Sequence, residues 1–255
     1  MIKTPWRQRA RAALLHLLLS LAVAALAATL VFWTWYPWPY YVLVGGTGLF
    51  VLITSVDVAL GPLLTFAVFN PPKGLRKLVF DLTVIVCLQI AALIYGLHTM
   101  WVARPVALAL ETDRLRVVRM IDVVAEELPL APAELRELSW LGPKLLRAEA
   151  PSDPGEQMAA IEMALAGSDL GARPKYWRVW DARARGEVLL GAKPLTELAQ
   201  RLPERVGDLE ASARVAKRPI AALGYLPVLA THADWIALVD IKTGDILGFA
   251  PINPY

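Results

Sequence analysis

Apolar residues dominate the chain from residue 12 to residue 103. Two short segments separate the apolar stretches, one rich in Trp, Tyr and Pro at 33–41 and one basic at 70–77. The apolar stretches at about 12–33, 41–69 and 78–101 each have the roughly 20 residues that a helix needs to cross a bilayer. Gly61-Pro62 interrupts the second stretch and predicts that the helix kinks or that its regular hydrogen bonding ends there, because proline has no N–H to donate. The pattern therefore predicts three transmembrane α-helices.

From residue 104 onward, short apolar segments alternate with charged ones, which is typical of a water-soluble domain. Residues 106–118 predict two short strands with a turn near Thr112-Asp113, and residues 234–240 and 245–249 predict a β-hairpin. Helices are expected at residues 131–137, 155–166, 194–202 and 203–216. The predicted fold class is a membrane protein, with three transmembrane α-helices followed by a soluble α+β domain. The predicted parts are residues 1–11, 12–103 and 104–255.

The two connections between the spans differ in chemistry, and the difference predicts an orientation. Trp33–Tyr41 is rich in Trp and Tyr, which favour the level of the lipid headgroups, and its prolines predict a tight hairpin. Asn70–Lys77 is a short basic loop, and residues 1–11 are basic as well. Because basic connections tend to stay in the cytoplasm, both should be cytoplasmic. Residues 104–255 then lie on the other side, which for a bacterial inner membrane is the periplasm.

A cleavable signal peptide is the alternative interpretation of the first apolar stretch. Basic residues precede it, and Ala25-Leu26-Ala27 resembles a cleavage site. However, the stretch continues without interruption to Trp33, beyond the 7–15 apolar residues of a typical signal peptide. The length favours an uncleaved span.

The distribution of charge argues against nucleic-acid binding, although the sequence pI is about 9.0. Residues 104–255 hold 19 Lys and Arg against 21 Asp and Glu, so the net charge of this part is about −2 (19 − 21). The basic excess lies beside the predicted spans and not in a groove of the soluble domain. Cys87 is the only cysteine and lies inside an apolar stretch, where a packing role is expected.

The predicted soluble domain offers little catalytic chemistry. His232 and Asp234 resemble a base and its orienting carboxylate, but no Ser or Cys nucleophile accompanies them in a recognisable motif. Asp240, Thr243 and Asp245 lack the series of spaced oxygens that calcium needs, and the sequence has no Cys/His cluster for zinc. No catalytic, cofactor or metal site is predicted, and the chain is not expected to be an enzyme.

Asp57 is the most informative residue, because it is the only formally charged side chain between Arg11 and Lys73. A carboxylate is costly in hydrocarbon and usually faces other helices or a partner. Two interpretations stay open: Asp57 contacts a partner, or it bonds within its own bundle, for instance to Gln89 or to a backbone amide freed by Pro62. Arg104 is expected to cap the third span by extending toward the headgroups.

Several short motifs together resemble a known family, the TfpX/TfpZ type IV pilin accessory proteins, which are also called FimB-like. The combination of an intramembrane Asp before Leu-Gly-Pro with an Arg-Pro exit from the third span is unusual, and the resemblance covers about residues 10–118. The motifs are Asp57-Val-Ala-Leu-Gly-Pro-Leu-Leu-Thr65, Val68-Phe-Asn-Pro-Pro-Lys73, Asp81-Leu, Gln89, Ala91-Ala-Leu-Ile-Tyr-Gly96 and Ala103-Arg-Pro-Val106.

The resemblance implies an inner-membrane, pilin-specific chaperone or assembly modulator with a periplasmic domain. The implied partners are the major type IV pilin, by its membrane helix and its globular head, and other inner-membrane proteins of pilus assembly. The bundle would bind the apolar pilin helix laterally and satisfy its few polar groups. The candidate partner-binding residues are Asp57, Gly61, Pro62, Thr65, Gln89 and Arg104.

Three other functions are compatible with parts of the pattern. A small transporter would use Asp57. However, the three spans hold a single buried carboxylate, with no inverted repeat and no partner cation to form a transport pathway. A membrane-anchored periplasmic enzyme would need a nucleophile, base and orienting group. A sensor subunit would need another protein for its output, because the predicted cytoplasmic segments are short.

Overall fold

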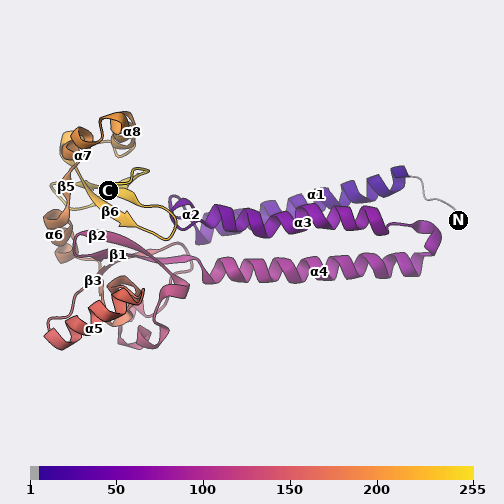
Figure 1. Ribbon diagram of the computed structural model, residues 1–255, viewed down its shortest axis with the longest axis horizontal. Coiled ribbons are helices and arrows are strands. Elements are labelled where there is room, and N and C mark those ends of the chain that lie inside the picture. The colour runs from indigo at the N-terminus through magenta and orange to yellow at the C-terminus, as the bar shows by residue number, and fades with distance from the viewer. Residues whose placement is uncertain (1–5) are drawn as a thin grey trace. The chain divides into compact units, whose positions relative to one another are not determined.

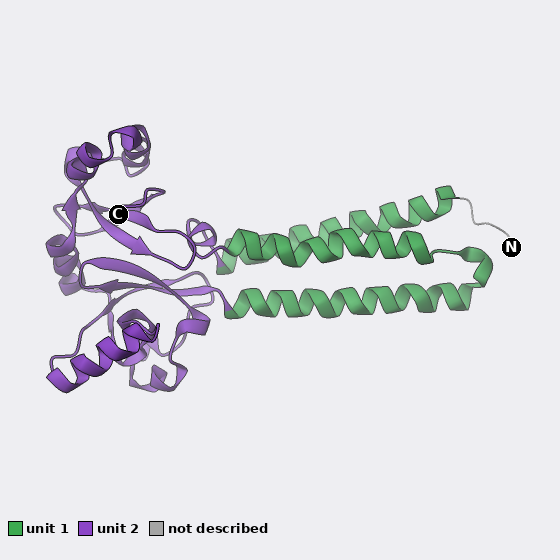
Figure 2. Ribbon diagram, in the orientation of Figure 1, with its two compact units in different colours: residues 1–35, 46–102 green, residues 36–45, 103–255 purple. Residues whose placement is uncertain are grey.

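The computed structural model describes residues 6–255, which form two compact units (Figure 2). Lys3, part of the predicted cytoplasmic N-terminus, lies outside the described residues. The first unit contains the chain up to Trp35 together with Gly46–Val102, and the second contains Tyr36–Gly45 together with Ala103–Tyr255. The chain therefore enters the second unit twice, once between two long helices and once after the third.

The first unit is a bundle of three long helices (Figure 1). They are α1 (Trp6–Leu30), which continues as the π-helical turn η1 (Val31–Trp35), α3 (Gly46–Val68) and α4 (Leu75–Val102). The 3₁₀ turn η2 (Pro71–Lys73) joins the last two, and α3 packs against both α1 and α4. All three helices are long and apolar enough to cross a membrane, which confirms the predicted class.

The second helix starts later than the sequence predicts. Gly45 has a positive φ of 71°, a left-handed conformation that suits glycine, and α3 begins at the next residue instead of at about residue 41. Pro62 lies inside α3, and the helix continues past it to Val68. The interruption predicted at Gly61-Pro62 is therefore local and does not end the helix.

The segment 36–45 contributes to the core of the second unit. Its short helix α2 (Tyr40–Leu43) places Leu43, which is fully buried, among side chains that include Leu108 and Leu226. The carbonyl oxygen of Leu43 accepts hydrogen bonds from the backbone N–H groups of His232 and Ala233 at 3.0 and 3.2 Å. Tyr36 is buried and Tyr40 packs against the same core as Leu43, so the aromatic segment that the sequence assigns to the headgroup level is partly protein core.

A mixed sheet of eight strands organises the second unit. Its path is β4-β3-β1-β2-β6-β7-β8, with β5 paired to β6. The β1–β3 and β2–β6 pairs are parallel and the other pairs are antiparallel. The strands are β1 (Pro105–Glu111), β2 (Arg114–Arg119), β3 (Lys144–Ala148), β4 (Trp177–Val179), β5 (Lys193–Pro194), β6 (Leu223–Leu229), β7 (Trp235–Asp240) and β8 (Ile246–Ala250). Both predicted hairpins, β1–β2 and β7–β8, are confirmed.

Helices cover both faces of the sheet. Successive side chains of a strand point to opposite faces, so both sets of apolar side chains are buried. Val188 of α6 (Ala182–Gly191) joins Leu43 over one face, and α7 (Leu195–Arg201) with α8 (Val206–Val215) covers the other face at β6–β8. Ala107 and Leu108, neighbours in β1, accordingly belong to different core clusters.

The predicted helices had mixed outcomes. Those at 155–166, 194–202 and 203–216 correspond to α5 (Pro154–Leu165), α7 and α8, so they are confirmed. The helix predicted at 131–137 is wrong, because this segment forms only the 3₁₀ turn η5 (Ala133–Leu135) after Pro132, whose backbone is not helical. Helix α6 was not predicted.

Replacing Leu43 by Ala should lower the free energy of unfolding of the second unit by about 2–5 kcal/mol, because the change leaves a cavity in its core. The measurement is the temperature at which the full chain, purified in detergent, becomes sensitive to protease within residues 103–255. Leu52→Ala is the matched control, since Leu52 lies exposed on α3. Equal transition temperatures for the two variants would show that α2 is not part of this core.

Candidate functional site

A small cavity between the three long helices contains Asp57. Its volume is about 230 Å³, and most of its lining is apolar. Polar side chains reach it from every helix: His16 and Ser20 of α1, Thr54 and Asp57 of α3, and Gln89 of α4. The bundle thus gathers side chains that are distant in the sequence around one carboxylate.

Three hydrogen bonds link the helices beside this cavity. His16 Nδ1 lies 2.5 Å from Thr65 Oγ1, and His16 Nε2 lies 2.7 Å from Gln89 Oε1. Gln89 Nε2 donates to the backbone carbonyl of Asp57 at 3.1 Å. Because the Gln89 oxygen only accepts, His16 Nε2 must donate, and a neutral imidazole can then accept from the Thr65 hydroxyl at Nδ1. The three bonds connect all three long helices through side chains.

The carboxylate of Asp57 is not part of this network. Gln89 bonds to the Asp57 backbone, and no hydrogen-bond partner for the buried Asp57 Oδ1 exists within residues 6–255. A buried polar atom without a partner costs roughly 1–3 kcal/mol, and more when it is charged. Asp57 Oδ1 is therefore the costly group of this site that stays without a partner among the described residues.

Gly61 lets Gln89 reach α3. A Cβ atom built on Gly61 would lie 2.2 Å from Gln89 Nε2, so any larger residue would displace the amide and break its two hydrogen bonds. Pro62 follows it inside the helix, where its missing N–H alters the local hydrogen bonding. Of the six predicted residues, five lie in the helical unit: Asp57, Gly61, Pro62, Thr65 and Gln89. Gln89 contacts Asp57 and Gly61 directly and is linked to Thr65 through His16.

Arg104 lies elsewhere, in the second unit. Its side chain is only 2 % exposed, and it donates from Nε to the Ser139 carbonyl at 3.2 Å and from a terminal nitrogen to Met120 Sδ at 2.7 Å. Burial lowers the pKa of Arg104 to about 10, and nearby Tyr36 partly offsets this shift. Arg104 thus holds two loops together instead of extending outward at the end of α4.

Sequence reasoning missed His16. An ionisable side chain within an apolar span is by itself a candidate for function, and His16 is such a residue. It was overlooked because it carries no formal charge, and its partners lie 49 and 73 positions away in the chain. Only the packing of α1 against the other two helices identifies them.

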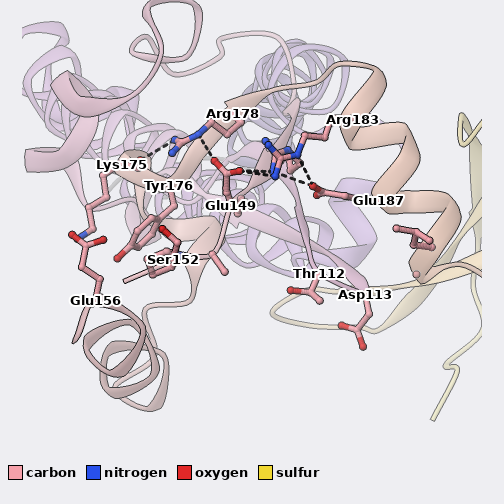
Figure 3. A pocket seen from close by; sticks show the side chains of 16 residues that line it. Thr112, Asp113, Glu149, Ser152, Glu156, Lys175, Tyr176, Arg178, Arg183 and Glu187 are labelled. Carbon is pink, nitrogen blue, oxygen red and sulfur yellow. Dashed lines mark hydrogen bonds and ion pairs between the residues drawn. The ribbon is translucent and has the colours of Figure 1, made fainter. Parts of the chain in front are cut away.

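The second unit has a larger groove of about 960 Å³ (Figure 3). Thr112-Asp113 and Glu149–Ser152 line it, so it lies beyond the carboxyl ends of the parallel strands β1 and β3. Arg147, Arg178 and Arg183 converge there on the Glu149 and Glu187 carboxylates, at 2.7–3.3 Å.

This ion-pair network has a structural explanation. Arg147 is buried, and its guanidinium joins β3 to α6 through Glu187, while Arg178 joins β4 to Glu149. The positive groups are thus largely neutralised by carboxylates of the same groove. In the part of the chain that the structure describes, no three His, Cys, Asp or Glu side chains are placed to hold a metal ion.

The comparisons with known proteins agree with one another on a single family. The family model described as "Fimbrial assembly protein FimB" matches residues 4–45, which include α1 and the segment that enters the second unit. The fimbrial assembly protein of serogroup I from Dichelobacter nodosus is 35% identical over 228 residues, which are 89% of this chain and 88% of that protein. The chain belongs to the FimB family of fimbrial assembly proteins.

Two further relatives from Dichelobacter nodosus support this membership. The fimbrial assembly protein of serogroup E1 is 33% identical over 89% of this chain and 88% of its own length. The protein of serogroups C1 and C2 is 46% identical over 117 residues, which cover 46% of this chain and 89% of that protein. No solved structure matches the chain. The FimB family agrees with the resemblance noted from the sequence motifs.

In this FimB-family protein, Gly61→Ala should destabilise the helical unit by about 1–3 kcal/mol, because the new methyl group displaces Gln89. Gly48→Ala is the matched control: it lies on the same helix, gains the same helix propensity and has no atom within 4 Å of the added carbon. The measurement is the fraction of detergent-purified protein that stays monodisperse after heating. Equal losses for both variants would contradict the close packing of Gln89 on Gly61.

The stability of the second unit in this FimB-family protein should depend on pH through Glu149, which lines the groove. Burial alone would raise the pKa of Glu149, but its hydrogen bonds to Arg147 and Arg178 outweigh that effect and lower the pKa. Because folding lowers this pKa, the ionised Glu149 carboxylate stabilises the fold at pH values above its ordinary pKa of 4.5. This contribution disappears as the pH falls through the lowered pKa.

Glu149→Gln should therefore unfold at a lower temperature than wild type at neutral pH, and the difference should shrink below pH 4.5. Thermal unfolding of the full chain in detergent, followed across this pH range, measures it. Glu210→Gln, at an exposed position on α8, is the control and should show no such pH dependence. A wild-type advantage that persists at low pH would exclude the proposed role of Glu149.

Proposed function

We propose that this protein is an inner-membrane accessory protein of type IV pilus assembly that binds the major pilin before or during its incorporation into the pilus. Membership of the FimB family and the names of its relatives support a role in assembling fimbriae. The observation that carries the mechanism is the buried Asp57 Oδ1, which has no hydrogen-bond partner among the described residues and lies at the cavity between the helices. In this proposal the protein acts by binding and not by catalysis.

The arrangement around Asp57 supports a partner-binding role over a purely internal one. Gln89, the expected internal partner, is already bonded to His16 and to the Asp57 backbone. Its amide therefore contributes nothing to the carboxylate. A group from outside the bundle that donates a hydrogen bond would remove the cost of the unpaired oxygen, so binding such a group is favourable.

The proposed partner group belongs to the membrane helix of the pilin. A pilin subunit awaiting assembly is held in the bilayer by a long apolar helix, and any polar group on that helix also lacks a partner there. Polar contacts between helices in bilayers contribute about 0.6–2 kcal/mol, which corresponds to a three- to thirty-fold change in affinity. Asp57 would thus select the correct helix, while apolar packing supplies the remaining affinity.

The charge pattern supports an orientation with the second unit in the periplasm. The start of α1 and the connection between α3 and α4 lie at the same end of the helical unit (Figure 1). Basic residues occupy both places, and basic ends are retained in the cytoplasm. They are Arg7, Arg9 and Arg11 at the start of α1, and Lys73, Arg76 and Lys77 near the connection.

In the proposed orientation, the second unit faces the globular head of the pilin. The proposed contact for the head is the groove of this unit, which is lined by charged side chains. Other inner-membrane proteins of pilus assembly are possible further partners of this unit.

The test is a deletion of the gene in its host, complemented with wild type, Asp57→Asn or Asp81→Asn. Wild type should restore surface pili, and Asp57→Asn should restore fewer because its amide offers no charge to the partner group. Asp81→Asn is the matched control, since Asp81 is partly exposed at the start of α4 and pairs with Lys73 at 3.7 Å. The measurements are surface pili, total pilin and the level of each variant in the membrane.

A photo-crosslinking residue at Ile90 tests direct contact with the pilin. Ile90 lines the cavity, whereas Tyr95, the control position, is exposed on the same helix and is not part of the lining. A pilin adduct should form from Ile90 and weaken about three- to thirty-fold with Asp57→Asn. Unchanged pili in the deletion strain would refute the assembly role. Restored pili without an Asp57-dependent adduct would refute only the mechanism.

A further inference from the structure

A group of exposed apolar side chains in the second unit lies close to where the chain leaves the long helices. Trp140 and Leu141 are 68% and 78% exposed, and Ile121 and Trp38 are also largely exposed. We define these four residues as the Trp140 surface. Exposed apolar groups of this kind usually mark a surface that binds a protein or a membrane.

Short links tie this surface to the end of α4. Arg104 is the second residue after Val102, so its Cα lies within about 7.6 Å of the last helical residue. The Arg104 side chain donates to the Ser139 carbonyl, next to Trp140, and its backbone carbonyl accepts from the N–H of Met120, next to Ile121, at 2.9 Å.

A second link comes from the connection between α1 and α3. Pro37 is the second residue after Trp35, and Gly142 lies against it, because a Cβ on Gly142 would approach Pro37 Cγ to 2.7 Å. Gly142 also has a positive φ of 70°, so this residue turns the chain directly after Leu141. Trp38 packs edge-on against Phe249, with 6.5 Å between the ring centroids.

We propose that the Trp140 surface inserts into the lipid headgroup region on the side of the membrane that carries the second unit. Its chemistry fits this occupant, because Trp favours the interface, where the ring is shielded from water while its N–H can still bond. Its position fits as well, since residues bonded to Arg104 and packed on Pro37 cannot move far from the ends of the spanning helices. Lipid contact would hold the second unit against the bilayer, independently of whether pilin is bound.

Leu190 provides a matched control within the same unit. It is 89% exposed, so it is as apolar and as accessible as Leu141. Its neighbour Gly191 lies against the turn at Thr112-Asp113, at the far end of β1 from Arg104. Seven residues of strand span about 23 Å, which places Leu190 well away from the Trp140 surface.

Site-directed spin labelling of the full chain in lipid nanodiscs tests this proposal. With Cys87→Ser as background, a nitroxide is attached at Leu141→Cys, at Ile121→Cys or, as control, at Leu190→Cys. Collision with oxygen, which concentrates in lipid, is compared with collision with a water-soluble nickel chelate. The ratio of oxygen to nickel accessibility should be higher at positions 141 and 121 than at position 190.

Two results would overturn the proposal. Labels at 141 and 121 with the same aqueous profile as the label at 190 would show that this surface faces water. Labels shielded from both reagents would show that protein covers it, as in a second copy of this chain. Because all three positions are exposed, the substitutions leave the core unchanged, and normal unfolding temperatures of the labelled proteins verify this.

Discussion

The absence of water inside a bilayer is the constraint on which the helical unit depends. Each backbone group must be satisfied within its own helix, and each polar side chain must find a partner among neighbouring helices. His16, Thr65 and Gln89 meet this requirement by bonding one another and the Asp57 backbone. Asp57 Oδ1 has no hydrogen-bond partner within residues 6–255, so it stays available to a donor from another molecule.

The two units are joined by more than the end of α4. The short segment between α1 and α3 belongs to the core of the second unit through Leu43, and Arg104 fixes the loops that follow α4. The sheet is thus built in part from residues that directly adjoin the helices. The soluble part of this FimB-family protein therefore includes residues from both of its connections to the long helices.

These features fit a protein that handles another membrane protein. In the proposed function, the cavity around Asp57 discriminates between helices in the bilayer, and the groove of the second unit contacts the partner outside it. A contact with the headgroups at the Trp140 surface would fix the height of that domain above the bilayer.

Hydropathy by itself determined the three long helices, and alternation with turn residues determined the β1–β2 and β7–β8 hairpins, because both signals arise between residues close in sequence. Local sequence also singled out Asp57, since a charge in an apolar run is visible without any fold. Tertiary structure decided the rest. The bonds of Gln89 to His16 and to the Asp57 backbone join segments 73 and 32 positions apart. The apolar character of Leu43 suits a membrane span and a protein core equally well, so only packing distinguishes them.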